Sequence, residues 1–197
     1  QMEKNCNYYL DNNNCYYGKT KNIHVGTEDK LDFVEAYVKE WIYKICQYRQ
    51  KNRLVYERLI FVDCMCSSGK YHNSQGNELE GTSLRVYKNF LNLSLRFPNM
   101  KFLLSINDFG KQETMCQKCR LDAIKKKVNV NIHYSPCLDV KEYLIQYKNK
   151  NIINYKDHVL LYYDPYQAMI YWKEIKCFLK NINFDLILSH FHQIDSA

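Results

Sequence analysis

The feature that most constrains the fold is a regular alternation between short apolar runs and longer segments with helical spacing. Each apolar run holds β-branched and aromatic residues and is bounded by polar ones, which is typical of a buried strand. We predict strands at 58–63, 101–106, 128–134, 158–163 and 184–189. Between them, apolar residues recur every three or four positions, as on one face of a helix. We predict these helices at 83–95, 114–127, 139–148 and 168–179.

One further amphipathic helix precedes the first strand, over about 28–49, with Leu31, Val34 and Val38 on its apolar side. Strands that alternate with helices are typical of parallel sheets joined by right-handed crossovers. We therefore expect a Rossmann-like open α/β sheet, mostly parallel, with helices on both faces and an added N-terminal helix. Residues 1–26 show no period and are expected to form a loosely structured lead-in, so 27–197 would be one α/β domain.

Composition narrows the functional classes. The 28 Lys and Arg exceed the 21 Asp and Glu by seven, a modest excess that only weakly indicates a polyanionic partner. Apolar stretches are much shorter than the roughly 20 residues of a membrane span, and no secretion signal is visible. We expect a cytoplasmic protein with no membrane association.

The nine cysteines are odd in number and are not spaced like a disulfide scaffold. Cys46, Cys64, Cys66 and Cys177 lie in apolar or strand-like segments and are expected to pack as small hydrophobic residues. The one CxxC pair, Cys116 and Cys119, has no second pair at similar spacing. We therefore predict no metal site.

Ligands of open α/β sheets bind outside the carboxyl ends of the strands, where the strand order reverses. Three segments lie at such ends: Asp63–Tyr71 with several small residues, Ser105–Asp108, and Tyr162–Gln167. Small residues let a ligand approach the backbone, and an acidic residue after the second strand can accept ribose hydroxyls. Each segment also has a purely structural interpretation. The first could be a plain turn, and Asp164 and Pro165 could cap and open a helix.

These residues give the chain a resemblance to the three-Cys-motif partner family, whose members are similar to class I S-adenosylmethionine-dependent methyltransferases. The resemblance spans about 27–195. It is carried by Lys30–Ile45, Asp63–Gly69, Gly81–Leu84, Asp164–Gln167 with Trp172 and Ile175, and Asp185–Leu188. Class I methyltransferases add two strands after the fifth, so we expect a shortened version or a sheet completed by something outside this sequence.

The resemblance implies S-adenosylmethionine as cofactor and an unknown methyl acceptor. The amino-acid end of the cofactor would contact the loop after the first strand, through Asp63, Cys64, Ser67 and Gly69. Asn107 or Asp108 would bind the ribose, and Asp139 would face the adenine amine. Asp164, Pro165 and Tyr166 would form the catalytic segment that orients the acceptor.

Five positions depart from the family pattern: Met65-Cys66 replaces Phe-Ala, Ser67 replaces a glycine, Asn107 replaces an acid, and Gln167 replaces a glycine. Each departure touches the cofactor pocket, so a catalytically silent relative that binds a protein partner is the alternative. Tyr8, Tyr9, Tyr16 and Tyr17 would be its interface residues. A nucleic-acid enzyme is also possible but not favoured. Its phosphate contacts would be Lys118, Arg120 and Lys125–Lys127.

Overall fold

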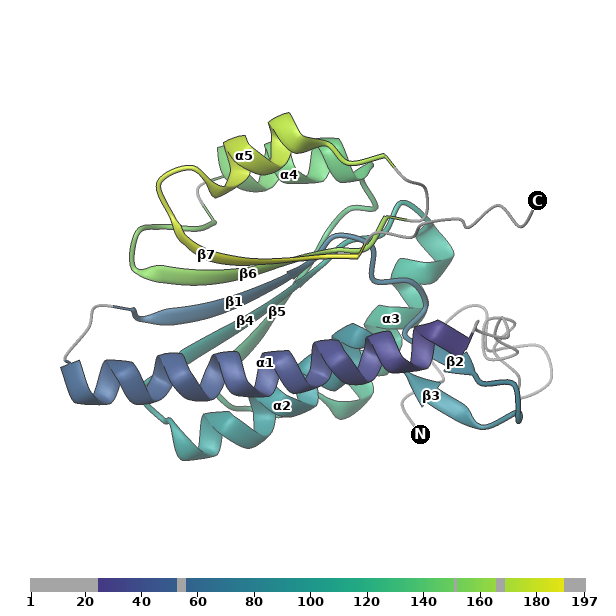
Figure 1. The fold of residues 1–197 in the computed structure, drawn as a ribbon, viewed down its shortest axis with the longest axis horizontal. Helices are drawn as coiled ribbons and strands as arrows, with labels where there is room; N and C mark the ends of the chain where they lie inside the picture. Colours follow the sequence, from purple (N-terminus) through teal and green to yellow (C-terminus); the bar gives the residue numbers. More distant parts are fainter. Residues whose placement is uncertain (1–24, 53–55, 151, 166–168, 190–197) are drawn as a thin grey trace.

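The computed structural model describes residues 25–52, 56–150, 152–165 and 169–189, and in this part of the chain a five-stranded sheet forms the centre of the molecule (Figure 1). Every neighbouring pair of its strands is parallel, and the spatial order is β5-β4-β1-β6-β7. The strands are β1 Arg58–Asp63, β4 Lys101–Ile106, β5 Val130–Tyr134, β6 Asp157–Tyr163 and β7 Asn183–Leu188. The predicted Rossmann-like α/β fold is confirmed.

Helices cover both faces of the sheet (Figure 1). One face carries α1 Val25–Asn52, α2 Thr82–Arg96 and α3 Lys111–Ile124. The other carries α4 Val140–Asn149 and α5 Trp172–Leu179. The two faces are buried by different side chains of the same strands, since successive strand residues point to opposite sides. In β1, Leu59 and Phe61 pack under α1 and α2, while Ile60 and Val62 pack against α4 and α5.

A small antiparallel hairpin, β2 Lys70–His72 and β3 Glu78–Glu80, was not predicted. Its strands have three residues each, too few to show alternation. The turn between them is set by Asn73, whose side chain accepts hydrogen bonds from the backbone N–H of Gln75 and Asn77, and by Gly76 at a φ of 81°. The hairpin extends from the carboxyl end of the sheet and returns the chain to the start of α2 (Figure 1).

Several predicted boundaries were wrong. Helix α3 begins at Lys111 and ends at Ile124, so Lys125–Lys127 follow the helix instead of forming its last turn. The backbone turns there, with Val128 N–H bonded to the carbonyl of Lys126, and β5 starts two residues later than predicted. Helix α5 begins at Trp172, and the predicted start at 168 lies outside the described residues.

Cys46, Cys64 and Cys66 are buried as expected, whereas Cys177 is exposed on the outer side of α5. The apolar neighbours of Cys177 belong to the buried side of an amphipathic helix, which Cys177 does not share.

Candidate functional site

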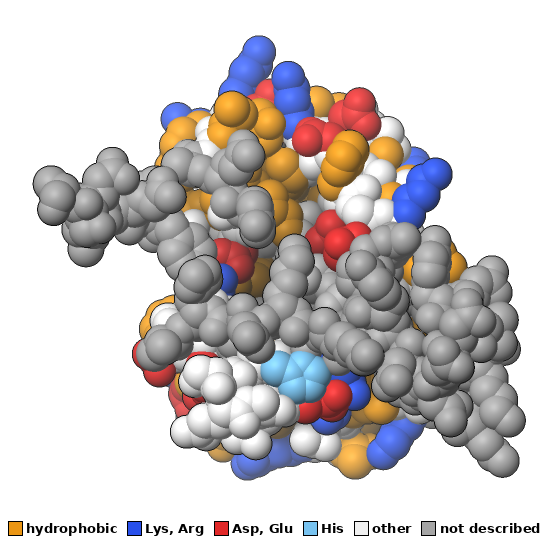
Figure 2. Space-filling view, turned by 90° about the vertical axis from the view of Figure 1, so that its right-hand side faces the viewer, with side chains coloured by type: hydrophobic (Ala, Val, Ile, Leu, Met, Phe, Trp, Pro, Cys, Tyr) orange, Lys and Arg blue, Asp and Glu red, His pale blue; other side chains and the backbone are white. Residues whose placement is uncertain are grey.

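The strand order reverses at β1, because β4 and β5 lie on one side of it and β6 and β7 on the other. Loops that leave the carboxyl ends of β1 and β6 therefore run in opposite directions and leave a crevice between them. Figure 2 looks onto this end of the molecule, where acidic side chains are visible between the two layers. The sequence predicted a site at this edge, and the fold brings Asp63 and Asp164 to the crevice.

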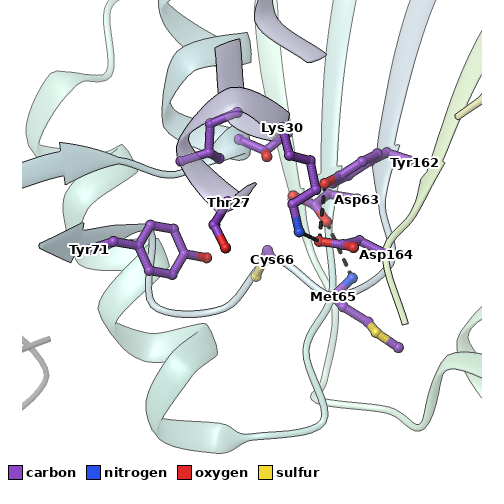
Figure 3. Close-up of a pocket in the computed structure, with 10 residues that line it drawn as sticks. Thr27, Lys30, Asp63, Met65, Cys66, Tyr71, Tyr162 and Asp164 are labelled. Carbon is purple, nitrogen blue, oxygen red and sulfur yellow. Dashed lines mark hydrogen bonds and ion pairs between the residues drawn. The ribbon is translucent and has the colours of Figure 1, made fainter. Parts of the chain in front are cut away.

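A small cavity lies in this crevice, under the first turns of α1 (Figure 3). Its volume is about 20 Å³, room for about one water molecule. The side chains that line it come from α1, the β1 loop, the hairpin, α2 and the end of β6. They are Thr27, Lys30, Leu31, Asp63, Met65, Cys66, Tyr71, Thr82, Tyr162 and Asp164. The cavity is thus small, polar and built by segments far apart in the sequence.

An ion pair lies in the wall of the cavity. Lys30 Nζ lies 2.6 Å from Asp164 Oδ2, and both side chains are about one-fifth exposed. The hydroxyl of Tyr162 donates to the same carboxylate oxygen at 3.1 Å. The other oxygen, Asp164 Oδ1, is buried and has no hydrogen-bond partner among the described residues. Asp164 therefore keeps an unused acceptor inside the cavity.

Asp63 is the second carboxyl group of the site, and its side chain is almost completely buried. It accepts a 2.6 Å hydrogen bond from the Ser83 hydroxyl and a 3.2 Å bond from the Met65 backbone N–H. Burial, together with the nearby carboxylates of Asp164 and Asp108, raises the pKa of Asp63 to about 7, against the opposing effect of these two bonds. Near neutral pH this carboxyl group can both hold and release a proton.

The loop after β1 is held in a tight conformation. Ser67 and Gly69 have φ angles of 53° and 85°. Asp108 fixes the loop, because its carboxylate accepts the Ser67 N–H at 2.8 Å and the Gly110 N–H at 2.9 Å. A side chain at position 69 is disfavoured by the positive φ angle and also by lack of space, since a Cβ there would lie 1.8 Å from the side-chain oxygen of Gln117.

Asn107 does not face the cavity as a ribose ligand would. Its amide nitrogen donates to the carbonyls of Cys64 and Leu138, at 3.1 and 2.9 Å. Its amide oxygen accepts from the Ser135 hydroxyl and the Leu138 N–H. Asn107 is buried and joins the loops that follow β1, β4 and β5. Its predicted role in ribose binding is replaced by this structural one, because no donor or acceptor of the amide remains free.

Asp139 and Pro165, two further predicted residues, follow β5 and β6. Asp139 caps α4, and its carboxylate accepts the Lys141 N–H at 2.8 Å. Pro165 is buried, and Tyr166 lies outside the described residues. The structural interpretation of Asp164 as a helix cap is wrong, because the following helix begins at Trp172 with Tyr171 as its cap.

Lys30 is the main site residue that the sequence analysis missed. It precedes Val34 and Val38 by four and eight positions, so it shares their side of the helix. A lysine on the same side of the helix as buried valines could have indicated this role, because a cation in that position needs an anionic partner.

The proposed phosphate contacts have different surroundings. The Arg120 guanidinium donates to the backbone carbonyl of Ser68 and so helps to hold the β1 loop. Lys118 lies over the ring of Tyr134, 5.3 Å from its centroid. Lys125–Lys127 are exposed beyond the end of α3. Tyr8, Tyr9, Tyr16 and Tyr17 lie outside the described residues.

Within the described ranges, no group of three or more His, Cys, Asp or Glu side chains is arranged to hold a metal ion. Nor is any helix in those ranges long and apolar enough to cross a membrane. Comparison with known proteins found no matching family model, no matching curated protein and no matching solved structure. The function must therefore be argued from the site itself.

Proposed function

We propose that this chain is an S-adenosylmethionine-dependent methyltransferase of the three-Cys-motif partner type, with an acceptor that remains to be identified. The observation that carries the proposal is the meeting of Asp63, Asp164 and Lys30 in one polar cavity, at the point where the strand order reverses. Nucleoside cofactors of open α/β folds bind at this point. The resemblance of the Asp63–Gly69 and Asp164–Gln167 segments to the family supports the same assignment.

The groups at the site fit the two polar ends of such a cofactor. Its amino-acid end carries an ammonium, and the cavity offers the carboxyl groups of Asp164 and Asp63 as partners of opposite charge. The ribose hydroxyls need an acceptor, and Asp108 supplies one. Asp108 follows β4, and its carboxylate accepts the Ser67 and Gly110 amides, which places it beside the β1 loop. Asp108 thus replaces Asn107 as the expected ribose ligand.

The chain's own residues would act mainly by position. When bound, the cofactor supplies a methyl group on a positively charged sulfur. Asp164 would orient an acceptor amine through its buried, unpartnered Oδ1. Asp63, with a pKa of about 7, lies near enough to Asp164 for their charges to interact and can take up a proton released at the site. Holding two reactants in line accounts for much of the rate of such transfers, and no covalent nucleophile is needed.

The test is calorimetric titration of the folded chain with S-adenosylmethionine and S-adenosylhomocysteine. We expect micromolar binding that Asp108→Asn weakens at least tenfold. Glu57→Gln is the control, because this exposed carboxylate lies just before β1, at the opposite edge of the sheet. The proposal fails if the folded chain binds neither compound at millimolar concentration.

A second candidate function is a catalytically silent, methyltransferase-like protein that binds a protein partner. Two observations favour it: Asn107 is used entirely inside the fold, and the cavity holds about one water molecule. This candidate predicts that neither compound binds at all. The same titration therefore separates the two functions.

A further inference from the structure

We propose that the first turns of α1 form a latch over the site, in which the Lys30 ammonium holds Asp164 until a cationic ligand displaces it. The nature of the ligand rests on the proposed function, whereas the latch itself rests on contacts within the chain. Lys30 and Asp164 are 134 residues apart, and their 2.6 Å ion pair joins α1 directly to the end of β6. Figure 3 shows the Lys30 side chain reaching down from α1 to Asp164.

The position of Lys30 makes it a competitor for a ligand. Among the described residues that line the cavity, two are acidic and Lys30 is the single basic one. A sulfonium or an amine on Asp164 Oδ1 would lie beside the lysine ammonium that Oδ2 of the same carboxylate holds, and the repulsion between two cations so close together favours displacement of the lysine. The cavity is also too small for any nucleoside while Lys30, Thr27 and Leu31 line it. Ligand entry therefore requires the same local movement that breaks the ion pair.

The rest of α1 is anchored, so this movement can stay local. From Val34 to Cys46 the helix buries a continuous row of apolar side chains against the sheet and α2. The turns before Val34 have fewer such anchors: Leu31 is buried, while Asp29, Asp32 and Phe33 are exposed. Short helix ends with few buried contacts open at much lower free energy than the core. The Asp32–Arg85 ion pair ties these turns to α2, and the Lys30 ion pair ties them to the end of β6.

Two substitutions on the same helix test the latch. Lys30→Met keeps the length and helix propensity of the side chain and removes its charge. Lys39→Met is the matched control, since Lys39 makes an exposed ion pair with Glu35, also on α1. Hydrogen exchange of the backbone amides of 27–34 is measured in both variants and in the unchanged chain, and each is titrated with S-adenosylmethionine.

We expect Lys30→Met to accelerate exchange over 27–34 at least tenfold and to raise the affinity for S-adenosylmethionine about tenfold. Lys39→Met should change neither by more than about twofold, because exposed ion pairs contribute little. Asp164→Asn should accelerate exchange like Lys30→Met but should not raise affinity, since it removes the carboxylate that the ligand needs. A purely structural ion pair would not produce this split between exchange and affinity.

The results separate the latch from the proposed function. Unchanged exchange over 27–34 in Lys30→Met overturns the latch, whatever the chain binds. Faster exchange with no binding by any variant supports the latch and overturns the proposed cofactor. In the unchanged chain, saturating S-adenosylmethionine should accelerate exchange over 27–30 as it displaces Lys30, and slower exchange there would contradict displacement.

Discussion

Single polar residues at the carboxyl edge of the sheet have two different tasks. Asn107 satisfies backbone groups of three loops and has nothing left for a ligand. Asp63 is equally buried, yet it carries a group whose charge state changes near neutral pH. The difference follows from chemistry, because an amide is neutral at every pH, whereas a buried carboxylate must be desolvated. We therefore expect Asp63 to make the stability of the folded state depend on pH near neutrality.

Replacing Asp63 by Asn should change how stability depends on pH. The pKa of Asp63 is about 7 in the folded chain, above the value of roughly 3.9 usual for an unfolded chain. Between these values the folded state binds a proton that the unfolded state has lost. The contribution of Asp63 is therefore fully present below about pH 4 and falls away as pH rises to 7. The loss is on the order of 4 kcal/mol.

Urea unfolding of the original chain and of Asp63→Asn, followed from pH 4 to pH 8, measures this effect. The free-energy difference between the two should shift in favour of the variant as pH rises, and should level off above pH 7. Glu57→Gln, at an exposed carboxylate, serves as the reference. A constant difference across this range would mean that Asp63 ionises as an ordinary aspartate.

Gly69→Ala should destabilise the chain more than Gly76→Ala. Both glycines have positive φ angles, 85° and 81°, so each substitution costs roughly 1–2 kcal/mol of backbone strain. Only at Gly69 does the new Cβ also meet a buried neighbour, the Gln117 amide, whereas the space around Gly76 is open. Thermal or urea unfolding should show the larger loss for Gly69→Ala. Adding Gln117→Ala should bring that loss close to the Gly76 value, and an unrelieved loss would show that the contact is not the cause.

At the level of elements, opposite ends of the central strands are held by different means. At the carboxyl end, side chains such as Asn107 and Asp108 tie loops together. At the amino end, Arg58 of β1 and Asp157 of β6 are register partners and form a two-bond ion pair, at 3.0 and 2.7 Å. Asp157 is buried, and its hydrogen bonds and negative charge raise the pKa of Arg58 against the opposing effect of burial. This ion pair thus stabilises the amino ends of β1 and β6, at the edge of the sheet opposite the site.

Arg58→Met should cost about 3–5 kcal/mol, because it leaves the buried carboxylate of Asp157 without its cation. It also removes the bond from Arg58 Nη2 to the carbonyl of Ile152. The comparison is Lys156→Met, which breaks the neighbouring exposed ion pair with Glu57 and should have no measurable effect. Chemical unfolding monitored by circular dichroism measures both. Equal losses would indicate that burial does not distinguish the two pairs.

At the scale of the whole molecule, one sheet serves two cores. Each central strand contributes alternate side chains to the α1–α3 face and to the α4–α5 face. Neither core can lose its strands without exposing the other, which favours a single cooperative unfolding transition. The two faces each contain one tryptophan, Trp41 on α1 and Trp172 on α5. They provide independent reporters of the two cores.

Single-tryptophan variants test this cooperativity. Trp172→Phe leaves the buried Trp41, and Trp41→Phe leaves the half-exposed Trp172. Each variant has its own stability, so its fluorescence is compared with its own far-ultraviolet circular dichroism. We expect coincident urea transitions by both probes in each variant. Separate midpoints within one variant would show that one layer unfolds before the other.

The sequence by itself determined the kind and order of the elements. Apolar periodicity reports local burial, so five strands, their intervening helices and the parallel sheet were predictable from single segments. The Asp63 and Asp164 segments could also be placed at the carboxyl edge, because parallel strands all end there.

Only the tertiary structure decided which side chains meet at that edge. The pairing of Lys30 with Asp164, the use of Asn107 inside three loops, and the contact of Gln117 with Gly69 depend on strand order and on how each helix packs. Periodicity says which side of a helix is buried but not which distant residue lies opposite. No local sequence pattern predicts a contact between residues 134 positions apart, because it forms only when the whole chain has folded.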